Sequence, residues 1–535
     1  MKKMLLLGDE AIAQGAIDAG ISGVYAYPGT PSTEIMEYVQ HSKAGKVGKV
    51  HCTWSANEKT AMETALGMSY AGKRALVCMK HVGLNVAADP FMCSAITGAN
   101  GGLLIASADD PSMHSSQNEQ DSRFYGKFAM VPVLEPSNQQ ESYDMMHYGY
   151  DLSEKYHVPV LLRITTRLAH SRSAVIIKEA KEQNSVSTPQ DSIQYVLLPS
   201  NARKRYKKLL GIQSTFKGES ENSGFNKYFE GKDKSLGFIV SGIAYNYLLE
   251  NYDGGEIPFP FIKISQYPLP KKMIERLCDE CKEIMVIEEG YPLIEESLSG
   301  LLGRGVKVRG RFDGSIPRDG ELNPNIVAQA LGLEKNTIIP TSDNVVGRPP
   351  SLCNGCPHAD TYIAINEAMS DFSKGRVLSD IGCYTLGALP PYQTINSCVD
   401  MGASITMAKG AADAGLLPAI SVIGDSTFTH SGITGLLDAV NDKSPITIFI
   451  LDNYTTAMTG GQYSQANGKI ENICRGIGVE EEHIRIIEPL KKNHSENVRI
   501  MKEEIAYQGV SVIIPRRECI VTLTQKSKEK KKDKQ

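Results

Sequence analysis

PAISVIGDSTFTHSG, residues 418–432, decides the fold of this chain, together with PITIFILDNYTTAMTGGQ at residues 445–462. Each stretch begins with a short apolar run and continues into a polar turn that contains glycine. Short, almost continuously apolar runs are typical of strands buried on both faces of a parallel sheet. The polar turns then lie beyond the carboxyl ends of the strands, where doubly wound α/β domains bind their ligands.

Two oxygen-bearing side chains follow these predicted strands. Asp425 comes directly after the first strand and Asn453 follows the second. Their oxygens suit Mg²⁺, which keeps diphosphate oxygens in its octahedral shell, and the carbonyl oxygen of Thr455 adds a third protein ligand. The small residues Gly424 and Ser426 allow backbone N–H groups to approach a phosphate at a helix start. The alternative is a pair of ordinary strand–turn–helix units without a ligand.

Length and charge set the broad class. A chain of 535 residues corresponds to about three domains. A net charge of −4 argues against nucleic acid or an anionic membrane as the main partner. No stretch approaches the roughly 20 apolar residues of a membrane helix. Asp9 and Glu10 interrupt the first apolar run too early for a signal peptide, so we expect a cytoplasmic protein.

Apolar runs alternate with helix-like segments along most of the chain. RALVCMK (74–80), VPVLLRI (158–164) and SLGFIVSG (235–242) are further examples of strand-like runs. The alternation predicts an α/β protein with several doubly wound, mostly parallel sheets. We expect α/β domains at 1–180, 235–340 and 345–520, with a polar linker at 181–234 and a basic tail at 521–535.

SLCNGCPHAD, residues 351–360, holds the pair Cys353 and Cys356. Taken alone, a C-x-x-C pair is half a zinc site, a redox disulfide, part of an iron–sulfur site or two unrelated core thiols. The eleven cysteines are an odd number in a chain without a recognisable secretory signal. Reduced thiols or metal ligands are therefore favoured over a framework of disulfides.

The G-D-S…N arrangement resembles the GDG…N motif of thiamine diphosphate enzymes, with Ser426 in place of the usual glycine. Over residues 5–520 the chain resembles the 2-oxoacid:ferredoxin oxidoreductases, and most closely the alpha subunits of indolepyruvate ferredoxin oxidoreductase. The resemblance is carried by YPGTPSTEI (27–35), NEK (57–59), MKHVGLNVAADP (79–90), YPLP (267–270), IPRDGEL (316–322), CNGCPH (353–358), DIGCYTLG (380–387), VDMGASI (399–405) and GDSTFTHSG (424–432).

The resemblance implies a thiamine-diphosphate-binding fold, with 1–180 as the pyrimidine-binding domain, 235–340 as a transketolase-C-terminal-like domain and 345–520 as the pyrophosphate-binding domain. Glu58 is the candidate acid that protonates N1′ of the aminopyrimidine, although a helix-cap glutamate is the alternative. Thr30 is placed to touch the substrate or the thiazolium. His81 and His430 either bind the substrate carboxylate, relay a proton or are structural. Further implied cofactor contacts are Gly382, Cys383, Tyr384, Gly402, Ala403, Gly424, Asp425, Ser426, Thr427, Asn453, Thr455, Met458 and Thr459.

The implied reaction is oxidative decarboxylation of an arylpyruvate, with the acyl group passed to coenzyme A and the electrons to ferredoxin. A [4Fe–4S] cluster held by Cys353, Cys356, Cys383 and Cys519 would carry those electrons. Zinc on four thiolates is chemically possible but carries no electrons. A separate beta subunit in an α2β2 assembly is the implied partner.

Two departures from the family bear on function. No cysteine follows Cys519, so we expect a form without the C-terminal ferredoxin-like module, and Ala359 replaces the arginine usual after G-C-P-H. Two other functions remain open. A non-oxidative thiamine-dependent decarboxylase or carboligase needs no cluster, and a non-catalytic thiamine-binding subunit needs no turnover.

Overall fold

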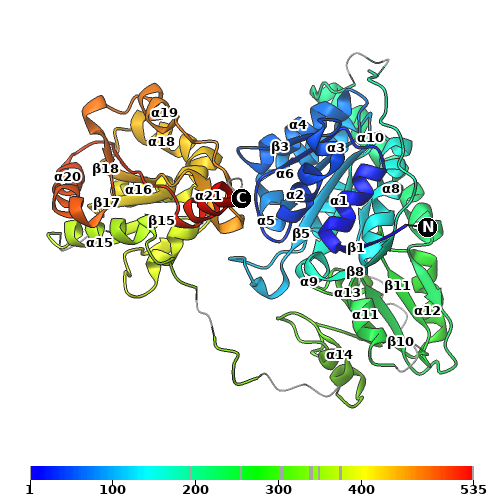
Figure 1. The fold of residues 1–535 in the computed structure, drawn as a ribbon. Coiled ribbons are helices and arrows are strands. Elements are labelled where there is room, and N and C mark those ends of the chain that lie inside the picture. Colours follow the sequence, from blue (N-terminus) through cyan, green and yellow to red (C-terminus); the bar gives the residue numbers. More distant parts are fainter. Residues whose placement is uncertain are drawn as a thin grey trace. The chain divides into compact units, whose positions relative to one another are not determined.

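The computed structural model describes residues 2–189, 191, 194–252, 256–299, 307–335, 342–347, 350–372 and 376–532. The chain divides into two compact units, Met1–Pro340 (unit 1) and Thr341–Gln535 (unit 2), and each is taken by itself below (Figure 1). Both units alternate helices with mostly parallel strands, which confirms the predicted α/β class. The domain boundary expected at 340–345 falls partly on residues outside the described ranges.

Unit 1 contains a seven-stranded sheet in which one edge strand is antiparallel and the other strands are parallel. Neighbouring parallel strands end at the same edge, so the loops that follow them gather there. In spatial order the strands are β12 (Gln266–Tyr267), β6 (Val133–Leu134), β7 (Val160–Thr165), β5 (Leu103–Asp109), β4 (Ala75–Lys80), β2 (Gly23–Ala26) and β3 (His51–Trp54).

Helices cover both faces of this sheet. Along β4, Leu76 and Cys78 belong to one apolar cluster, whereas Ala75 and Val77 belong to another. This alternation with a period of two places successive side chains on opposite faces, and both faces are buried. The first cluster includes α1 (Gly8–Asp18), α2 (Thr33–His41) and α8 (Gln139–Tyr156), and the second includes α4 (Glu58–Tyr70) and α6 (Ala88–Thr97).

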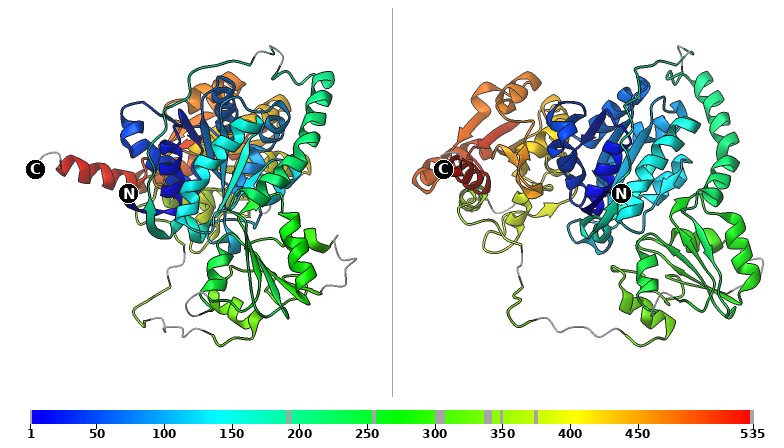
Figure 2. Two further views of the ribbon diagram at one scale, coloured as in Figure 1. Left: turned by 90° about the vertical axis from the view of Figure 1, so that its right-hand side faces the viewer. Right: turned by 45° about the vertical axis from the view of Figure 1, so that its right-hand side comes forward.

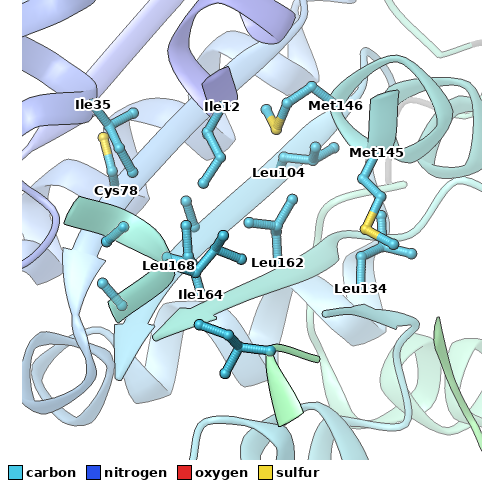
Figure 3. Close-up of a cluster of buried hydrophobic side chains, with 14 of the residues drawn as sticks. Ile12, Ile35, Cys78, Leu104, Leu134, Met145, Met146, Leu162, Ile164 and Leu168 are labelled. Atoms are coloured by element: carbon cyan, nitrogen blue, oxygen red, sulfur yellow. The ribbon is translucent and has the colours of Figure 1, made fainter. Parts of the chain in front are cut away.

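Figure 3 shows the first of these clusters. Ile12 from α1 and Ile35 from α2 lie over the strand residues Cys78, Leu104 and Leu162, and all five are fully buried. Each large aliphatic side chain buried in this way contributes about 1.5–3 kcal/mol to folding. The packing holds α1 and α2 against the sheet and so fixes where the loops at the strand ends begin.

Unit 1 also contains an antiparallel pair of short strands, β1 (Lys3–Leu7) and β8 (Arg172–Ile176). A five-stranded sheet is the second of its two large sheets. Its helices are α11 (Ala244–Leu249), α12 (Lys271–Glu280), α13 (Leu293–Ser299) and α14 (Pro324–Leu331). Its strands are β14 (Lys307–Arg309), β13 (Glu283–Ile287), β10 (Gly237–Ser241), β11 (Phe261–Ile264) and β9 (Lys227–Phe229), parallel except for β9.

The segment between the two sheets of unit 1 contains a long helix, α10 (Pro199–Asn222). This helix contacts α6 beside the larger sheet and α12 beside the smaller one (Figure 2). The polar segment expected as a linker at 181–234 therefore contains a helix that packs against both parts of unit 1.

Buried charges also join the two sheets of unit 1. Arg163 on β7 donates from Nε to Asp109 at 2.6 Å, and Arg123 pairs with Glu288 at 3.0 Å. Tyr267 donates to Glu135 at 2.6 Å. Burying charges is costly unless each one is paired and hydrogen-bonded, as these are. The network ties the loops at the end of β5 to the residues that follow β13.

Unit 2 is built on a six-stranded sheet that is parallel throughout, and a small hairpin of β19 (Thr455–Thr456) and β20 (Gln462–Tyr463) lies beside it. One face packs on α15 (Pro357–Met369) and α20 (His494–Ala506), and the other on α16 (Ala403–Asp413), α18 (Ile433–Asn441) and α19 (Ile470–Ile477). The strand order is β16 (Ser397–Cys398), β15 (Arg376–Ser379), β17 (Ala419–Gly424), β18 (Ile446–Leu451), β22 (Ser511–Pro515) and β21 (Ile484–Ile487).

Helix α21 (Ile520–Lys532) occupies most of the segment expected as a basic tail, whose last three residues lie outside the described ranges. Within the described part of the chain, no helix combines the length and the apolar character that a membrane span requires.

Candidate active site

Asp425 lies at the carboxyl end of β17 and is almost fully buried. Its Oδ1 accepts a hydrogen bond from the Ser426 amide at 2.8 Å, but Oδ2 has no partner among the residues that the structure describes. Burial, and then the nearby carboxylate of Asp452, raise the pKa of Asp425 to about 8. Buried polar atoms are almost always paired in folded proteins, so the free oxygen fits a site for a cation.

Asn453 occupies the matching position on the neighbouring strand. Gly424 and Leu451 are register partners in β17 and β18, so Asp425 and Asn453 follow paired strand ends. Oδ1 of Asn453 accepts from the Thr455 amide at 3.2 Å. Tyr454, between them, has a φ of 65°, a left-handed conformation that is uncommon for a non-glycine residue and clusters at functional sites.

His358 connects this strand end to the C-x-x-C turn. The residue is buried near the start of α15, and its Nε2 lies 3.3 Å from Nδ2 of Asn453. Burial lowers the pKa of His358 to about 4, so the ring is neutral and Nε2 can accept the amide hydrogen. This contact turns Oδ1 of Asn453 away from the histidine. Sequence reasoning assigned no role to His358, and its only signal was its place in the C-N-G-C-P-H run.

The structure brings the four candidate cluster cysteines into one neighbourhood. Cys353 and Cys356 form a turn before α15, with the Cys356 amide donating to the Cys353 carbonyl at 3.0 Å. Cys519 precedes α21, and its amide donates to the carbonyl of Asn453 at 3.3 Å. Burial raises the pKa of Cys383 to about 12, and the nearby thiols of Cys356, Cys519 and Cys353 add to that shift.

The spacing of these sulfurs bears on the kind of metal. In the described part of the chain, each set of three potential metal-ligand atoms that lie within 4.8 Å of one another comes from other residues. No three of the four sulfurs are therefore that close together. A tetrahedral zinc ion with Zn–S distances of about 2.3 Å would hold its sulfurs roughly 3.8 Å apart. A four-iron cluster is larger than one ion and holds its thiolates further apart. The described sulfurs are therefore not arranged as a preformed tetrahedral zinc site.

Several other predicted cofactor contacts surround Asp425. A Cβ on Gly424 would lie 2.6 Å from the ring of Tyr384, so the strand end and this ring touch. Thr427 donates from its hydroxyl to the carbonyl of Ile381 at 3.3 Å, beside Gly382. Ser426 accepts from the Thr456 hydroxyl at 3.0 Å. These contacts place the DIGCYTLG run directly against the GDS turn.

Gly402 directly precedes α16, and His430 lies on the helical turn Phe428–Gly432 that follows the GDS turn. Gly402 has a φ of 94°, and a Cβ there would come 2.5 Å from the Cβ of Ser431. His430 is buried, with Nδ1 2.6 Å from the Ser431 hydroxyl. Ala403 begins α16, whereas Met458 and Thr459 lie on the turn of the β19–β20 hairpin, where Met458 is exposed.

In unit 1, Glu58 and His81 follow β3 and β4, strands that lie on either side of β2. Glu58 is buried at the start of α4, and a Cβ on Gly83 would come 2.6 Å from its Oε1. His81 begins α5 (His81–Val86), and its Nε2 donates to the Asn118 carbonyl at 3.2 Å. Its Nδ1 is buried and has no partner within the described part of the chain.

Thr30 lies in the turn after β2, at the same edge of the sheet. The Gly29 amide donates to the Thr33 hydroxyl at 3.0 Å, and the Ser32 hydroxyl donates to the Gly29 carbonyl at 2.7 Å. Ser32 therefore braces the turn, and its side chain does not cap α2. The side chain of Lys80 donates to the Ser115 carbonyl at 2.6 Å nearby.

The predicted site residues that the structure describes thus gather at two places, one in each unit. Unit 1 gathers Thr30, Glu58 and His81 at the carboxyl edge of its larger sheet. Unit 2 gathers Asp425, Asn453, the DIGCYTLG run and the four cysteines at the carboxyl edge of its own sheet.

Two family models match this chain, one in each unit. Residues 14–200 match the family described as "Pyruvate flavodoxin/ferredoxin oxidoreductase, thiamine diP-bdg". Residues 380–513 match "Thiamine pyrophosphate enzyme, C-terminal TPP binding domain". A solved 2-oxoglutarate:ferredoxin oxidoreductase from Magnetococcus marinus aligns with 17% identity and a TM-score of 0.49, over 62% of this chain and 65% of that chain.

Full-length relatives give the stronger comparison. Indolepyruvate oxidoreductase subunit IorA of Archaeoglobus fulgidus is 39% identical over 97% of this chain and 87% of the relative. The subunits of Methanothermobacter thermautotrophicus and Pyrococcus abyssi are each 37% identical over 97% of this chain, and over 87% and 86% of their own lengths. The chain therefore belongs to the IorA family of indolepyruvate oxidoreductase subunits, within the thiamine-diphosphate-dependent 2-oxoacid oxidoreductases.

Proposed function

We propose that the chain catalyses the oxidative decarboxylation of an arylpyruvate to an acyl-CoA, passing the electrons through a [4Fe–4S] cluster to ferredoxin. Membership of the IorA family supports thiamine-dependent oxidation of a 2-oxoacid. The gathering of Cys353, Cys356, Cys383 and Cys519 beside Asn453 is the observation that carries the iron–sulfur part of the proposal.

Asp425, Asn453 and Thr455 would hold Mg²⁺ and, through it, the diphosphate of the cofactor. The free Oδ2 of Asp425 and the Oδ1 of Asn453 lie at paired strand ends. Both are oxygen donors, which Mg²⁺ prefers over nitrogen and sulfur. His358 would act as a positioning residue, since it binds the amide nitrogen of Asn453 and leaves the oxygen for the metal. The aromatic ring of Tyr384 closes one side of this site.

Thiamine diphosphate, when bound, supplies an electron sink for the decarboxylation of a 2-oxoacid. Glu58 would hold the proton at N1′ of the aminopyrimidine, and its burial keeps that hydrogen bond away from water. His81 would accept or return a proton at Nδ1, because its Nε2 is already committed to the Asn118 carbonyl. Thr30 and His430 are proposed to contact the substrate.

The four thiolates would hold the cluster in a largely water-excluded setting. Cys356 and Cys519 are buried, whereas Cys353 is exposed and gives the site one accessible side. Burial raises the pKa of Cys356 to about 11, so metal binding must displace its proton. A redox-inert zinc ion in the same place could not pass electrons.

The remaining parts of the proposal concern partners. Coenzyme A would take the acyl group, ferredoxin would take the electrons, and a separate beta subunit would complete an α2β2 enzyme in the cytoplasm. The expectation of a partner subunit is supported by the names of the relatives, each of which is a subunit of an oxidoreductase.

The test is an anaerobic assay of the purified chain, with and without a co-expressed beta subunit. Indolepyruvate and phenylpyruvate are supplied with coenzyme A and ferredoxin, and acyl-CoA and reduced ferredoxin are measured. We expect two electrons to reach ferredoxin for every acyl-CoA formed, together with a visible sulfur-to-iron absorbance that dithionite bleaches. Release of CO2 and an aldehyde by a colourless protein, without reduction of ferredoxin, would instead support the non-oxidative decarboxylase. Unchanged activity of the complex in Glu58→Gln would support the non-catalytic subunit.

A further inference from the structure

Three ionisable side chains from three helices of unit 1 meet at one place, and none of them has been assigned a role above. Asp9 lies on α1, Glu34 on α2 and His170 at the end of α9 (Thr166–His170). One potential ligand atom of each lies within 4.8 Å of the other two. Oε1 of Glu34 is 3.5 Å from Nε2 of His170.

Asp9 is the unusual member of this group. Its side chain is fully buried, and neither carboxylate oxygen has a hydrogen-bond partner among the residues that the structure describes. Oε2 of Glu34 is also buried, and no described residue forms a hydrogen bond with it. Buried carboxylates are normally hydrogen-bonded or paired with a cation. This one is aimed at a second carboxylate and an imidazole instead.

The nearby charges do not satisfy these groups. The adjacent Glu10 is engaged elsewhere, since its Oε2 accepts from the Leu7 amide at 2.8 Å and its Oε1 lies 3.7 Å from Arg172. Within the described part of the chain, no lysine or arginine forms an ion pair with Asp9 or Glu34. Two carboxylates and one imidazole therefore face each other without a counter-charge other than a proton on His170.

A proton and a metal ion are the two ways to complete such a group. Burial, and then the charges of Glu34 and Glu10, raise the pKa of Asp9 well above its usual range. A protonated Asp9 would still need an acceptor within hydrogen-bond distance, and the described residues provide none. A metal ion with ligand distances of about 2.0–2.2 Å spans donor atoms up to roughly 4 Å apart.

We propose that Asp9, Glu34 and His170 bind a divalent transition-metal ion, with Mn²⁺ and Zn²⁺ as the ions that the donors suit best. Two carboxylate oxygens and one imidazole nitrogen are donors that both ions accept. Three protein ligands leave room for water in the remaining positions. The ion neutralises the buried carboxylate of Asp9 and the partly exposed one of Glu34, and it joins α1, α2 and α9.

The position of Glu34 gives this metal a structural role. Glu34 follows Thr33, whose hydroxyl accepts the hydrogen bond from Gly29 in the turn that carries Thr30. An ion on Glu34 therefore holds the first turn of α2, and with it the proposed substrate-contacting turn. The site is separate from the proposed magnesium site in unit 2, because its ligands come entirely from unit 1.

The experiment measures Mn²⁺ binding to the chelator-treated full-length chain by electron paramagnetic resonance, without thiamine diphosphate. Mn²⁺ is the probe because it binds carboxylate and imidazole ligands and disfavours the thiolates of unit 2. The variants are Asp9→Asn, Glu34→Gln and His170→Ala. Glu10→Gln is the matched control from the same helix, and Asp425→Asn reports on the other candidate site.

We expect one Mn²⁺ per chain in the wild type, in Glu10→Gln and in Asp425→Asn, with Zn²⁺ competing for it. Each of the three ligand variants should weaken binding by at least about 10-fold. Mn²⁺ should also raise the melting temperature of the wild type and not that of Asp9→Asn. If Asp9→Asn fails to fold, the more accessible Glu34→Gln and His170→Ala variants decide the matter. Binding that is absent from the wild type, equal in all variants, or lost only in Asp425→Asn would overturn the proposal.

Discussion

Nε2 of His358 lies 3.3 Å from Nδ2 of Asn453, and this contact ties the C-x-x-C turn to a strand end 95 residues further along the chain. The carbonyl of Asn453 also accepts from the Cys519 amide at 3.3 Å. One asparagine is thus held by residues that flank the candidate cluster, while its Oδ1 accepts from the Thr455 amide at 3.2 Å. A short, rigid connection of this kind would keep the two proposed groups at a fixed separation.

Replacing His358 should weaken cofactor binding before it affects folding. His358→Ala removes the acceptor that orients the Asn453 amide, so we expect the affinity for thiamine diphosphate at fixed Mg²⁺ to fall by about 10- to 100-fold, as for other groups that orient metal ligands. Isothermal titration calorimetry measures this. His358→Gln can still accept from the amide and should recover part of the affinity. Equal binding in wild type and His358→Ala would show that the contact does not orient the asparagine.

Cys383 and Cys398 provide a matched pair for testing the cluster. Cys383 lies near the three other candidate ligands, whereas the Cys398 thiol donates to the Asp380 carbonyl at 3.6 Å. After anaerobic reconstitution, Cys398→Ser should retain about four irons per chain and Cys383→Ser should lose most of them. Iron analysis and visible absorbance give the readout. Retention of iron by Cys383→Ser would exclude it as a ligand.

Gly83 should be essential for the position of Glu58. A Cβ at residue 83 would lie 2.6 Å from Oε1 of Glu58, so Gly83→Ala must push the carboxylate away from its place. Since misplacing a catalytic group by about 1 Å can cost 100-fold in rate, we expect kcat to fall by one to two orders of magnitude. Steady-state kinetics of the assembled enzyme test this.

Gly67→Ala is the control for that variant. Gly67 lies on α4, the helix that Glu58 begins, and a Cβ there meets no atom within 4 Å. Alanine should raise the helix stability by about 0.5–1 kcal/mol and leave kcat unchanged. A similar loss of kcat in both variants would mean that activity responds to any change near α4 and does not depend on the contact between residue 83 and Glu58.

Glu289 should make the stability of the chain depend on pH. It is buried, its Oε1 accepts from the Leu322 amide at 3.2 Å, and burial raises its pKa to about 7. The folded state therefore holds this proton more tightly than the unfolded state, whose glutamate pKa is about 4.3. The stabilisation is complete below that value and is lost as pH rises through 7, by at most about 1.4 kcal/mol per pH unit.

Glu289→Gln keeps an acceptor for Leu322 but carries no proton to lose. Urea unfolding at several pH values between 5 and 8 should therefore show the wild type losing stability relative to the variant as pH rises. Glu283→Gln, on the preceding strand β13, serves as the control and should follow the wild type. A constant difference between wild type and Glu289→Gln would contradict the assignment.

Much of the architecture is readable from short-range pattern. The runs that end at Gly424 and Leu451 are apolar enough to be strands buried on both faces, and both lie in the parallel sheet of unit 2. Since parallel neighbours end at one edge, the placement of Asp425 and Asn453 beside each other follows from sequence order and hydrophobicity alone. The roles of those residues, and of the other predicted site residues, stay predictions until the experiments above are done.

Other features depend on contacts between segments that sequence pattern does not link. The tyrosine of the YPLP run and the glutamine before it supply β12, an edge strand of the larger sheet of unit 1, although the surrounding chain builds the smaller sheet. The meeting of Cys519 with the C-x-x-C turn, and of Asp9 with Glu34 and His170, likewise joins distant segments.

The sequence by itself determined the α/β class, the strand ends and the residue types that could serve thiamine, magnesium and iron, because these depend on local periodicity and side-chain chemistry. Only the tertiary structure decided that His358 binds Asn453 and that Gly83 leaves room for the carboxylate of Glu58. It also decided that Asp9 is buried without a hydrogen-bond partner among the described residues. Those contacts arise when whole helices and sheets pack, and the free energy of packing depends on side chains that are far apart in the chain.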